Sequence, residues 1–353
     1  MEIGSEFWLN DTEVACKVAK EPDMFQQYGT AVFTASGRSA IQLLLQEMNP
    51  ICKTVLLPAY ICESVIAPFV NQGYRCLFYE LEKDLSPGIA SCVRQEPIGI
   101  FLHLGYFGFH SDNGIQQLLR ELKQTGTVIV EDVTHTLFST YGRFCENDYY
   151  IASLRKWMGL PSGGMLASQN CRLSNRVEQN YEFAELRKEA LALKQSYIRH
   201  QEPELKIRYL QLFALAEECL DREIAPVGMD EMSKQILCGI DWQELIQKRR
   251  ENYRFLTEEL KDRQEFVSVF ETPDSDICPL FFPVFVKSER EQLRNYLREE
   301  QIYCPVHWKV PRWIDLAERQ TTAWIYSRIL SIPCDQRYGI EDMARVVTKI
   351  KEF

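Results

Sequence analysis

Short apolar segments alternate with amphipathic stretches through residues 31–132 of this sequence. A strand, a helix and a further strand at this spacing are typical of βαβ units, which assemble into a mainly parallel sheet flanked by helices. The segments that we expect as strands are 31–34, 54–58, 76–80, 98–103 and 127–132. The sequence therefore predicts an α/β fold with a mainly parallel central sheet.

Three regions of different character divide the 353 residues, a length that allows about two domains. Residues 1–30 carry little periodicity and indicate an N-terminal arm. Residues 31–230 hold the βαβ pattern and then a long, charged helical stretch that Pro203 divides, so they are expected to form a large domain. Residues 231–353 are expected to form a smaller α/β domain that includes its leading helix.

The C-terminal region has its own order of elements. Its leading helix is expected to run from about residue 233 to about residue 260. Beyond about residue 267 the pattern becomes strand, helix and strand. These three elements are expected at 279–286, 289–300 and 302–308.

Charge and cysteine content exclude several classes of protein. A net charge of −10 argues against a general nucleic-acid binder and against binding to anionic membranes. No apolar run approaches the roughly 20 residues of a membrane span, and the polar, acidic start has no secretory signal. The 12 cysteines include no Cys-x-x-Cys pair and no Cys/His cluster at zinc spacing. We therefore expect a cytoplasmic protein with free thiols and no metal site.

Several notable residues fall where the predicted strands end. Pro58, His103 and Asp132 each close an apolar segment. Because ligands bind beyond the carboxyl ends of the strands in such sheets, these positions form the expected rim of a site. For His103 a structural role is the favoured alternative, and for Asp132 a helix cap or a surface turn is the alternative.

The stretch Ser36-Gly37-Arg38-Ser39 follows the strand expected at 31–34 and begins a helix. The helix is indicated by apolar residues recurring on one face between Ile41 and Met48. Small residues at a helix start leave backbone N–H groups open, and such an end binds phosphate. For this stretch taken alone, a helix cap by Ser36 or Ser39 is the favoured alternative.

Lys156 stands between the apolar run 149–152 and a run of glycines, with Ser153 three residues before it. A lysine in such a place can act as a covalent catalyst that holds pyridoxal phosphate (PLP) as a Schiff base. A solvated loop lysine is the alternative for this short motif taken alone.

Support for the cofactor comes from the other parts that its chemistry requires. A carboxylate near the pyridine nitrogen keeps that nitrogen protonated, so that the ring can accept electrons. The chain offers a candidate for each part in order along the sequence: the stretch 36–39 for the phosphate, then Asp132 with His135, then Ser153 and Lys156.

These motifs resemble those of the DegT/DnrJ/StrS-type sugar aminotransferases, a family of the fold type I (aspartate aminotransferase-like) PLP-dependent superfamily. The similarity covers nearly the whole chain. The segments that carry it are Ile3–Phe7, Ser36–Ala40, Leu57–Tyr60, His103–Gly108, Glu131–His135, Pro305–Trp308 and Leu330–Asp335.

The resemblance implies a role for each candidate residue. Lys156 would carry the cofactor and shuttle the proton, Asp132 would pair with the pyridinium nitrogen, and His135, where the family has Gln, would lie by the phenolic oxygen. Ser153 would bind the phosphate together with the backbone amides of Arg38 and Ser39. The cofactor-binding residues implied are Gly37, Arg38, Ser39, Tyr60, Asp132, His135, Ser153 and Lys156, with Cys62 as the alternative to Tyr60 for stacking on the ring.

The resemblance also implies a reaction and an assembly. The expected reaction moves an amino group from an amino acid, glutamate for preference, to a nucleotide-linked keto-sugar, and the expected assembly is a homodimer with sites at the subunit interface. Another reaction of the same cofactor, such as sugar dehydration, and a non-catalytic regulator are the alternatives.

The chain departs from the family pattern in three places. It lacks the family's Ser-Phe-His before the lysine and its Asn-x-Arg segment near 229–233, and the stretch 176–220 is unusually helical. Contacts of Arg38, Arg155 and His307 with the substrate stay open.

Overall fold

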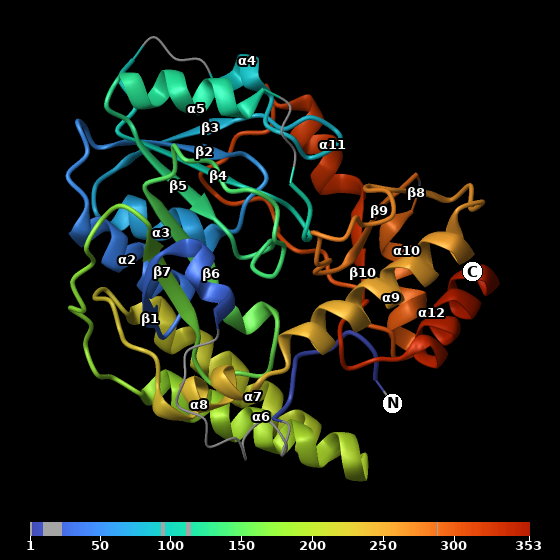
Figure 1. Ribbon diagram of the computed structural model, residues 1–353. Coiled ribbons are helices and arrows are strands. Elements are labelled where there is room, and N and C mark those ends of the chain that lie inside the picture. The colour runs from blue at the N-terminus through green and yellow to red at the C-terminus, as the bar shows by residue number, and fades with distance from the viewer. Residues whose placement is uncertain (1, 10–22, 93–95, 111–113, 288) are drawn as a thin grey trace.

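The computed structural model has an α/β architecture with two sheets (Figure 1). It describes residues 2–9, 23–92, 96–110, 114–287 and 289–353. Part of the predicted N-terminal arm, residues 10–22, lies outside these ranges. Within them, no helix combines the length and the apolar character needed to cross a membrane.

A seven-stranded sheet lies at the centre of the larger part, with the strand order β1-β7-β6-β5-β4-β2-β3. Its strands are β1 (Thr30–Thr34), β2 (Thr54–Pro58), β3 (Arg75–Tyr79), β4 (Ile100–Leu104), β5 (Val128–Asp132), β6 (Tyr149–Ser153) and β7 (Gly164–Ser168). The neighbours from β3 to β6 pair in parallel, whereas β7 runs antiparallel to β6 and β1. The predicted mainly parallel sheet is confirmed.

Burial on both faces explains why these strands are continuous apolar runs in the sequence. Every residue of β4 is buried, and helices cover the sheet on two sides. A strand in this position has no solvent face, so its sequence does not alternate between apolar and polar residues.

The strands are connected by α2 (Gly37–Glu47), α3 (Glu63–Asn71), α4 (Ile89–Cys92) and α5 (Ile115–Gln124). In Figure 1, α5 lies on one side of β2, β3 and β4, and α2 and α3 lie on the other. The predicted apolar face of α2 is confirmed, because Ile41 and Leu44 are buried.

Two long helices, α6 (Glu182–His200) and α7 (Pro203–Arg222), form a hairpin that projects beyond the large sheet at the bottom of Figure 1. Gln201 ends α6 in the left-handed conformation, with φ of 57°, and Pro203 begins α7, where its missing N–H costs no hydrogen bond. The predicted division of this stretch at Pro203 is confirmed. The rings of Tyr197 and Tyr209 pack between the two helices, with centroids 5.8 Å apart.

The single helix expected from about residue 233 to 260 is wrong, because the structure has two helices there. α8 (Glu231–Gly239) ends before Ile240, and α9 (Trp242–Leu260) begins after Asp241. The Asp241 side chain accepts hydrogen bonds from the amides of Gln243 and Glu244, which starts a new helix.

The C-terminal part has a three-stranded antiparallel sheet in the order β10-β9-β8. Its further elements are β8 (Phe266–Ser268), β9 (Phe282–Val286), α10 (Arg290–Glu299), α11 (Gln320–Arg328), β10 (Ile329–Ile332) and α12 (Ile340–Glu352). The predictions of β9 and α10 are confirmed, whereas the strand expected at 302–308 is wrong. Both edges of β9 are occupied by β8 and β10, and Pro305 has no N–H to donate to a ladder.

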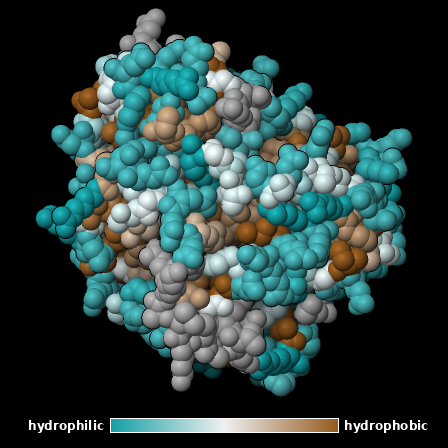
Figure 2. All heavy atoms as spheres, in the orientation of Figure 1, coloured by the Kyte–Doolittle hydropathy of each residue, from teal (hydrophilic) through white to brown (hydrophobic). Residues whose placement is uncertain are grey.

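The first described residues cross from the C-terminal part to the hairpin. Ile3 forms a parallel bridge with Ile302 and is fully buried in the C-terminal core, while the neighbouring Glu2 forms an ion pair with Lys206 of α7. The domain boundaries at residues 30 and 230 stay predictions. Figure 2 shows that the face in view is mostly hydrophilic, with hydrophobic side chains in small groups.

Candidate active site

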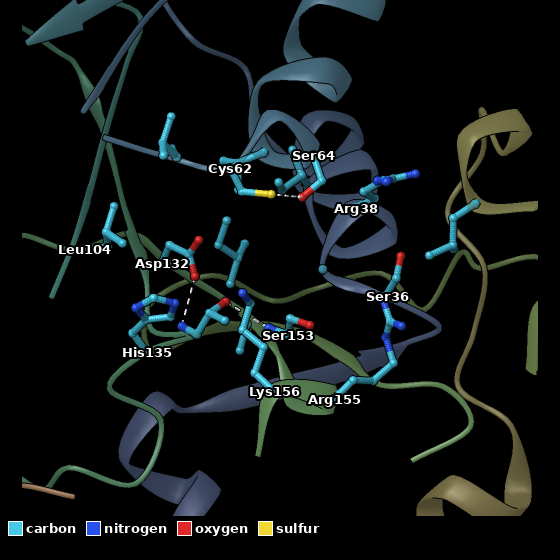
Figure 3. Close-up of a pocket in the computed structure, with 18 of the residues that line it drawn as sticks. Ser36, Arg38, Cys62, Ser64, Leu104, Asp132, His135, Ser153, Arg155 and Lys156 are labelled. Atoms are coloured by element: carbon cyan, nitrogen blue, oxygen red, sulfur yellow. Dashed lines mark hydrogen bonds between the residues drawn. The ribbon is translucent and has the colours of Figure 1, made fainter. Parts of the chain in front are cut away.

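A cavity of about 270 Å³ lies at the carboxyl ends of β4, β5 and β6 (Figure 3). The last residue of each strand lines it: Leu104, Asp132 and Ser153. This is the edge of the sheet at which the sequence predicts a site. Of the predicted residues, the cavity brings together Gly37, Arg38, Asp132, His135, Ser153 and Lys156.

Asp132 is a buried carboxylate aimed at the cavity from the end of β5. Its Oδ1 accepts a hydrogen bond of 2.9 Å from the amide of Thr134. Burial raises the pKa of Asp132, although the hydrogen bond from Thr134 and the charge of Lys156 oppose the rise. A cationic partner in the cavity would stabilise the ionised carboxylate.

His135 lies flat against an indole. Burial lowers the pKa of His135 well below the usual value, and the nearby charge of Lys156 lowers it further. The imidazole stacks on Trp308, with centroids 5.4 Å apart and planes 17° apart. Its Nε2 is buried and has no hydrogen-bond partner among the residues that the structure describes.

Lys156 ends the short 3-10 turn η2 (Leu154–Lys156), which follows β6 directly. The turn is held from both sides, because the indole N–H of Trp157 donates to the Thr134 carbonyl at 2.7 Å and the amide of Leu154 donates to the Gly163 carbonyl at 3.1 Å. Nζ of Lys156 lies 5.8 Å from the ring centroid of Trp308. The predicted alternative of a solvated loop lysine does not fit this half-buried position in the cavity wall.

The glycine run after Lys156 allows the backbone of β7 to approach the start of α2. A Cβ on Gly164 would lie 2.1 Å from the carbonyl oxygen of Ser36, so no side chain fits there. Gly37 in turn lies against β6, where a Cβ would be 3.4 Å from Cβ of Ser153. These contacts place the first turn of α2 beside Ser153.

Ser36 caps α2 and thereby decides which amides are available to a ligand. Its Oγ accepts the amide of Ser39 at 3.1 Å, and its carbonyl accepts the amide of Ala40. The expectation that the Ser39 amide binds a phosphate is therefore wrong, because that amide already has a partner and Ser39 does not line the cavity. The amides of Gly37 and Arg38, at the first turn, have no hydrogen-bond partner among the described residues.

The expectation for Tyr60 is also wrong, because its ring packs behind the cavity wall. Tyr60 is fully buried, and its ring centroid lies 4.7 Å from that of Trp308 and 4.9 Å from that of Tyr326. Cys62, the alternative, does line the cavity and accepts a hydrogen bond from Ser64 Oγ at 3.0 Å. Trp308 supplies the aromatic surface that the sequence assigned to Tyr60.

Two histidines named from the sequence do not line this cavity. His103 contacts Asn147 Oδ1 at 2.9 Å, in agreement with its structural alternative. His307 contacts Ser331 Oγ through Nδ1 at 2.9 Å and is not among the lining residues. The described ranges contain no cluster of three side chains suited to a metal ion.

A charged group at the hairpin side of the cavity escaped the sequence analysis. Arg187 of α6 and Glu217 of α7 line the cavity together with Arg38, Arg155 and Glu6. In the sequence, Arg187 and Glu217 lie in a charged helical stretch and look like a solvated helix face. One signal was available in the sequence. Residues 176–220 depart from the family pattern, and such a departure can indicate a segment with a function of its own.

Comparisons with known proteins concern the family and the fold of the chain. The model of the DegT/DnrJ/EryC1/StrS aminotransferase family matches residues 229–351. No curated protein matches the chain significantly.

Many solved structures share the fold. PseC of Helicobacter pylori, an aminotransferase involved in the biosynthesis of pseudoaminic acid, has a TM-score of 0.72 at 13% identity and covers 100% of this chain and 99% of its own. The PLP-form of Spr1654 from Streptococcus pneumoniae has a TM-score of 0.71 at 14% identity, with 100% and 98% covered. The sugar aminotransferase CalS13 from Micromonospora echinospora has a TM-score of 0.66 at 16% identity, with 99% and 98% covered.

At these identities the likeness concerns the fold, and the family match covers the C-terminal part. The matched residues contain the motifs at Pro305–Trp308 and Leu330–Asp335. The chain has the fold of the fold type I PLP-dependent sugar aminotransferases, and its resemblance to the DegT/DnrJ/EryC1/StrS aminotransferase family is confirmed.

Proposed function

We propose that this protein is a PLP-dependent aminotransferase that moves an amino group from an amino acid, glutamate for preference, to a nucleotide-linked keto-sugar. One arrangement carries the proposal. In Figure 3, Lys156 stands between Asp132 and His135 on one side and the start of α2, with Arg38, on the other. A lysine between a carboxylate and an anion-binding helix end is the arrangement that a phosphorylated pyridine requires.

The residues present fit such a cofactor. Asp132 is a buried carboxylate suited to a protonated ring nitrogen. At the other end, the open amides of Gly37 and Arg38 and the side chain of Ser153 suit a phosphate. The volume of about 270 Å³ approaches the lower end of ordinary small-ligand pockets, ~300 Å³.

PLP, when bound, supplies an electron sink that stabilises negative charge at the carbon from which a proton is removed. Asp132 would hold a proton on the ring nitrogen, and the amide of Thr134 keeps the carboxylate oriented for this task. Nζ of Lys156 would take the proton from the amino-bearing carbon of the donor and later return a proton to the sugar carbon that receives the amino group. Trp308 and Leu104 would exclude water from this proton transfer.

The assembly and the compartment are part of the proposal. A homodimer would close the side of the cavity where Glu6 and Glu217 are exposed, and light scattering would then give twice the chain mass of 41.3 kDa. The cysteines within the described ranges are free thiols, which supports action in the reducing cytoplasm.

The direct test is covalent trapping. Purified protein with added PLP should absorb visible light, and borohydride should leave a cofactor adduct on the peptide that contains Lys156. Lys156→Ala should form no adduct, whereas Lys234→Ala, at an exposed lysine, should react like the parent. Colourless protein, or an adduct elsewhere, would contradict the proposal.

A second measurement identifies the reaction. Titration with amino acids should bleach the visible band, and the best donor should do so at the lowest concentration. Added keto-sugar nucleotide should restore the band and give an amino-sugar. A deoxygenated sugar without a new amine would show that the alternative reaction, dehydration, takes place.

A further inference from the structure

Three arginines from three different elements converge at the hairpin side of the cavity. Arg38 comes from the first turn of α2, Arg155 from the turn before Lys156, and Arg187 from α6. All three face the carboxylate of Glu217 on α7, with N–O distances of 3.9, 3.3 and 3.9 Å in that order. Arg38 also pairs with Asp221, and Arg187 lies 3.8 Å from Glu6.

The cations of this cluster are less exposed than the anions, which lie at its rim. The exposed fractions of the side chains are 21% for Arg38, 15% for Arg155 and 5% for Arg187, against 48% for Glu217, 68% for Asp221 and 55% for Glu6. The carboxylates can therefore turn into solvent at little cost, whereas Arg187 has nowhere else to go. Because a buried charge that loses its partner is costly, Arg187 needs another anion when a carboxylate moves away.

The arginines also keep unused donors on their buried side. Nε of Arg155 and Nε of Arg187 are buried and have no hydrogen-bond partner among the described residues. Burial, together with the charge of Arg155, lowers the pKa of Arg187 to about 10. A buried guanidinium with an unpaired N–H is costly unless an anion arrives to pair with it.

We propose that Arg38, Arg155 and Arg187 form a phosphate-ester subsite and that Glu217 is an internal counter-ion which the ligand displaces. The subsite adjoins the open amides of Gly37 and Arg38, so helix end and guanidinium groups would bind the same anion. The inference rests on the proposed function for the nature of its ligands. The cofactor and the substrate would present the same phosphate chemistry to the arginines, so either of them can supply the phosphate.

The test compares the direction in which two substitutions change the phosphate affinity of the full chain without cofactor. Glu217→Gln should bind inorganic phosphate about tenfold more tightly in a calorimetric titration, because the competing carboxylate is gone, and Arg187→Gln should bind it at least about tenfold more weakly. The matched controls are Glu218→Gln, the exposed neighbour of Glu217 on α7, and Arg208→Gln, an exposed arginine on the same helix. Both controls should bind phosphate like the parent.

An unchanged or weaker phosphate affinity in Glu217→Gln would overturn the proposal, since it would show that Glu217 only supports the arginines structurally. Glu217 is exposed, so this variant should fold even if Arg187→Gln does not, and thermal melting reports on both. A parent protein that binds no phosphate, or the same weak binding in all variants, would also overturn it.

Two further titrations identify the source of the phosphate. If Arg187→Gln weakens binding of PLP but not of pyridoxal, which lacks the phosphate, the subsite serves the cofactor. If Arg187→Gln leaves PLP binding unchanged but weakens the binding of inorganic phosphate to the PLP-loaded protein, the subsite serves the substrate. The titrations with inorganic phosphate should give the same result in Lys156→Ala, so failure of the proposed catalysis and failure of the subsite are distinguishable.

Discussion

The backbone amide of Phe107 donates a hydrogen bond of 3.3 Å to Nδ1 of His135. Because Nδ1 accepts, a neutral ring carries its proton on Nε2. Trp308 lies nearly parallel to the ring and restrains its orientation. His135 is therefore a fixed hydrogen-bond donor in the cavity wall, at the end of β5.

This arrangement predicts how substitutions of His135 behave. His135→Gln keeps an N–H donor and should retain most of the activity and the visible band of the bound cofactor. His135→Leu removes the donor, and the amino-donor half-reaction should slow by about 10-fold to 100-fold. The spectrum and the single-turnover rate of both variants check this, and equal rates for the two would contradict a donor role.

Asp132 should be more sensitive than His135. Asp132→Asn keeps the shape but cannot stabilise a proton on the ring nitrogen, so the half-reaction should slow by about a hundredfold or more. The measurement is the rate at which an amino acid bleaches the cofactor band. Asp262→Asn, at an exposed position outside the cavity, is the control and should react like the parent.

Cys62 offers a test of occupancy that does not depend on turnover. Its thiol lines the cavity, whereas the free thiol of Cys145 is exposed outside it. Iodoacetamide should therefore modify both residues in the cofactor-free protein, and PLP should protect Cys62 alone. Peptide mass mapping measures the two sites in one sample, and protection of both residues or of neither would count against binding in this cavity.

Lys194 should make stability depend on pH in a defined window. It is buried on α6, where its Nζ donates to Ser5 Oγ at 2.9 Å, and burial lowers the pKa of Lys194 from 10.5 to about 7. Between these values the unfolded chain binds more protons than the folded chain, so this group contributes stability that rises with pH. Below about pH 7 its penalty is fully present.

The prediction for Lys194→Met follows from that sign. Relative to the parent, the variant should be most stabilised at pH 6, and its advantage should shrink by about 1.4 kcal/mol per pH unit between pH 7 and 10. Urea unfolding at several pH values measures the difference. Lys188→Met, at an exposed lysine on the same helix, should show no such slope, and a flat difference for Lys194→Met would refute the assignment.

The sequence predicted the part of the site that depends on strand order. Asp132 and Ser153 follow apolar runs directly, and parallel strands bring such ends to one edge of the sheet. It failed for Tyr60 and Ser39, because the direction of a side chain after a strand and the partner of a helix amide depend on packing. The place of Arg187 in the cavity wall could not be predicted for a related reason. An arginine in a charged helix has the same sequence pattern whether it faces solvent or a cavity.

The two wrong predictions of secondary structure have local causes that the periodicity of apolar residues does not reveal. Asp241 interrupts a long helical pattern because its side chain caps the next helix. Residues 302–308 have the composition of a strand, but Pro305 has no N–H to donate to a ladder, and Ile302 forms only an isolated bridge with Ile3.

The bridge between Ile3 and Ile302 places the first described residues in contact with several parts of the molecule. Within five positions they touch the C-terminal core through Ile3, the helical hairpin through Glu2, and the mouth of the cavity through Glu6. A deletion within residues 2–6 would therefore disturb the C-terminal core, the helical hairpin and the cavity together.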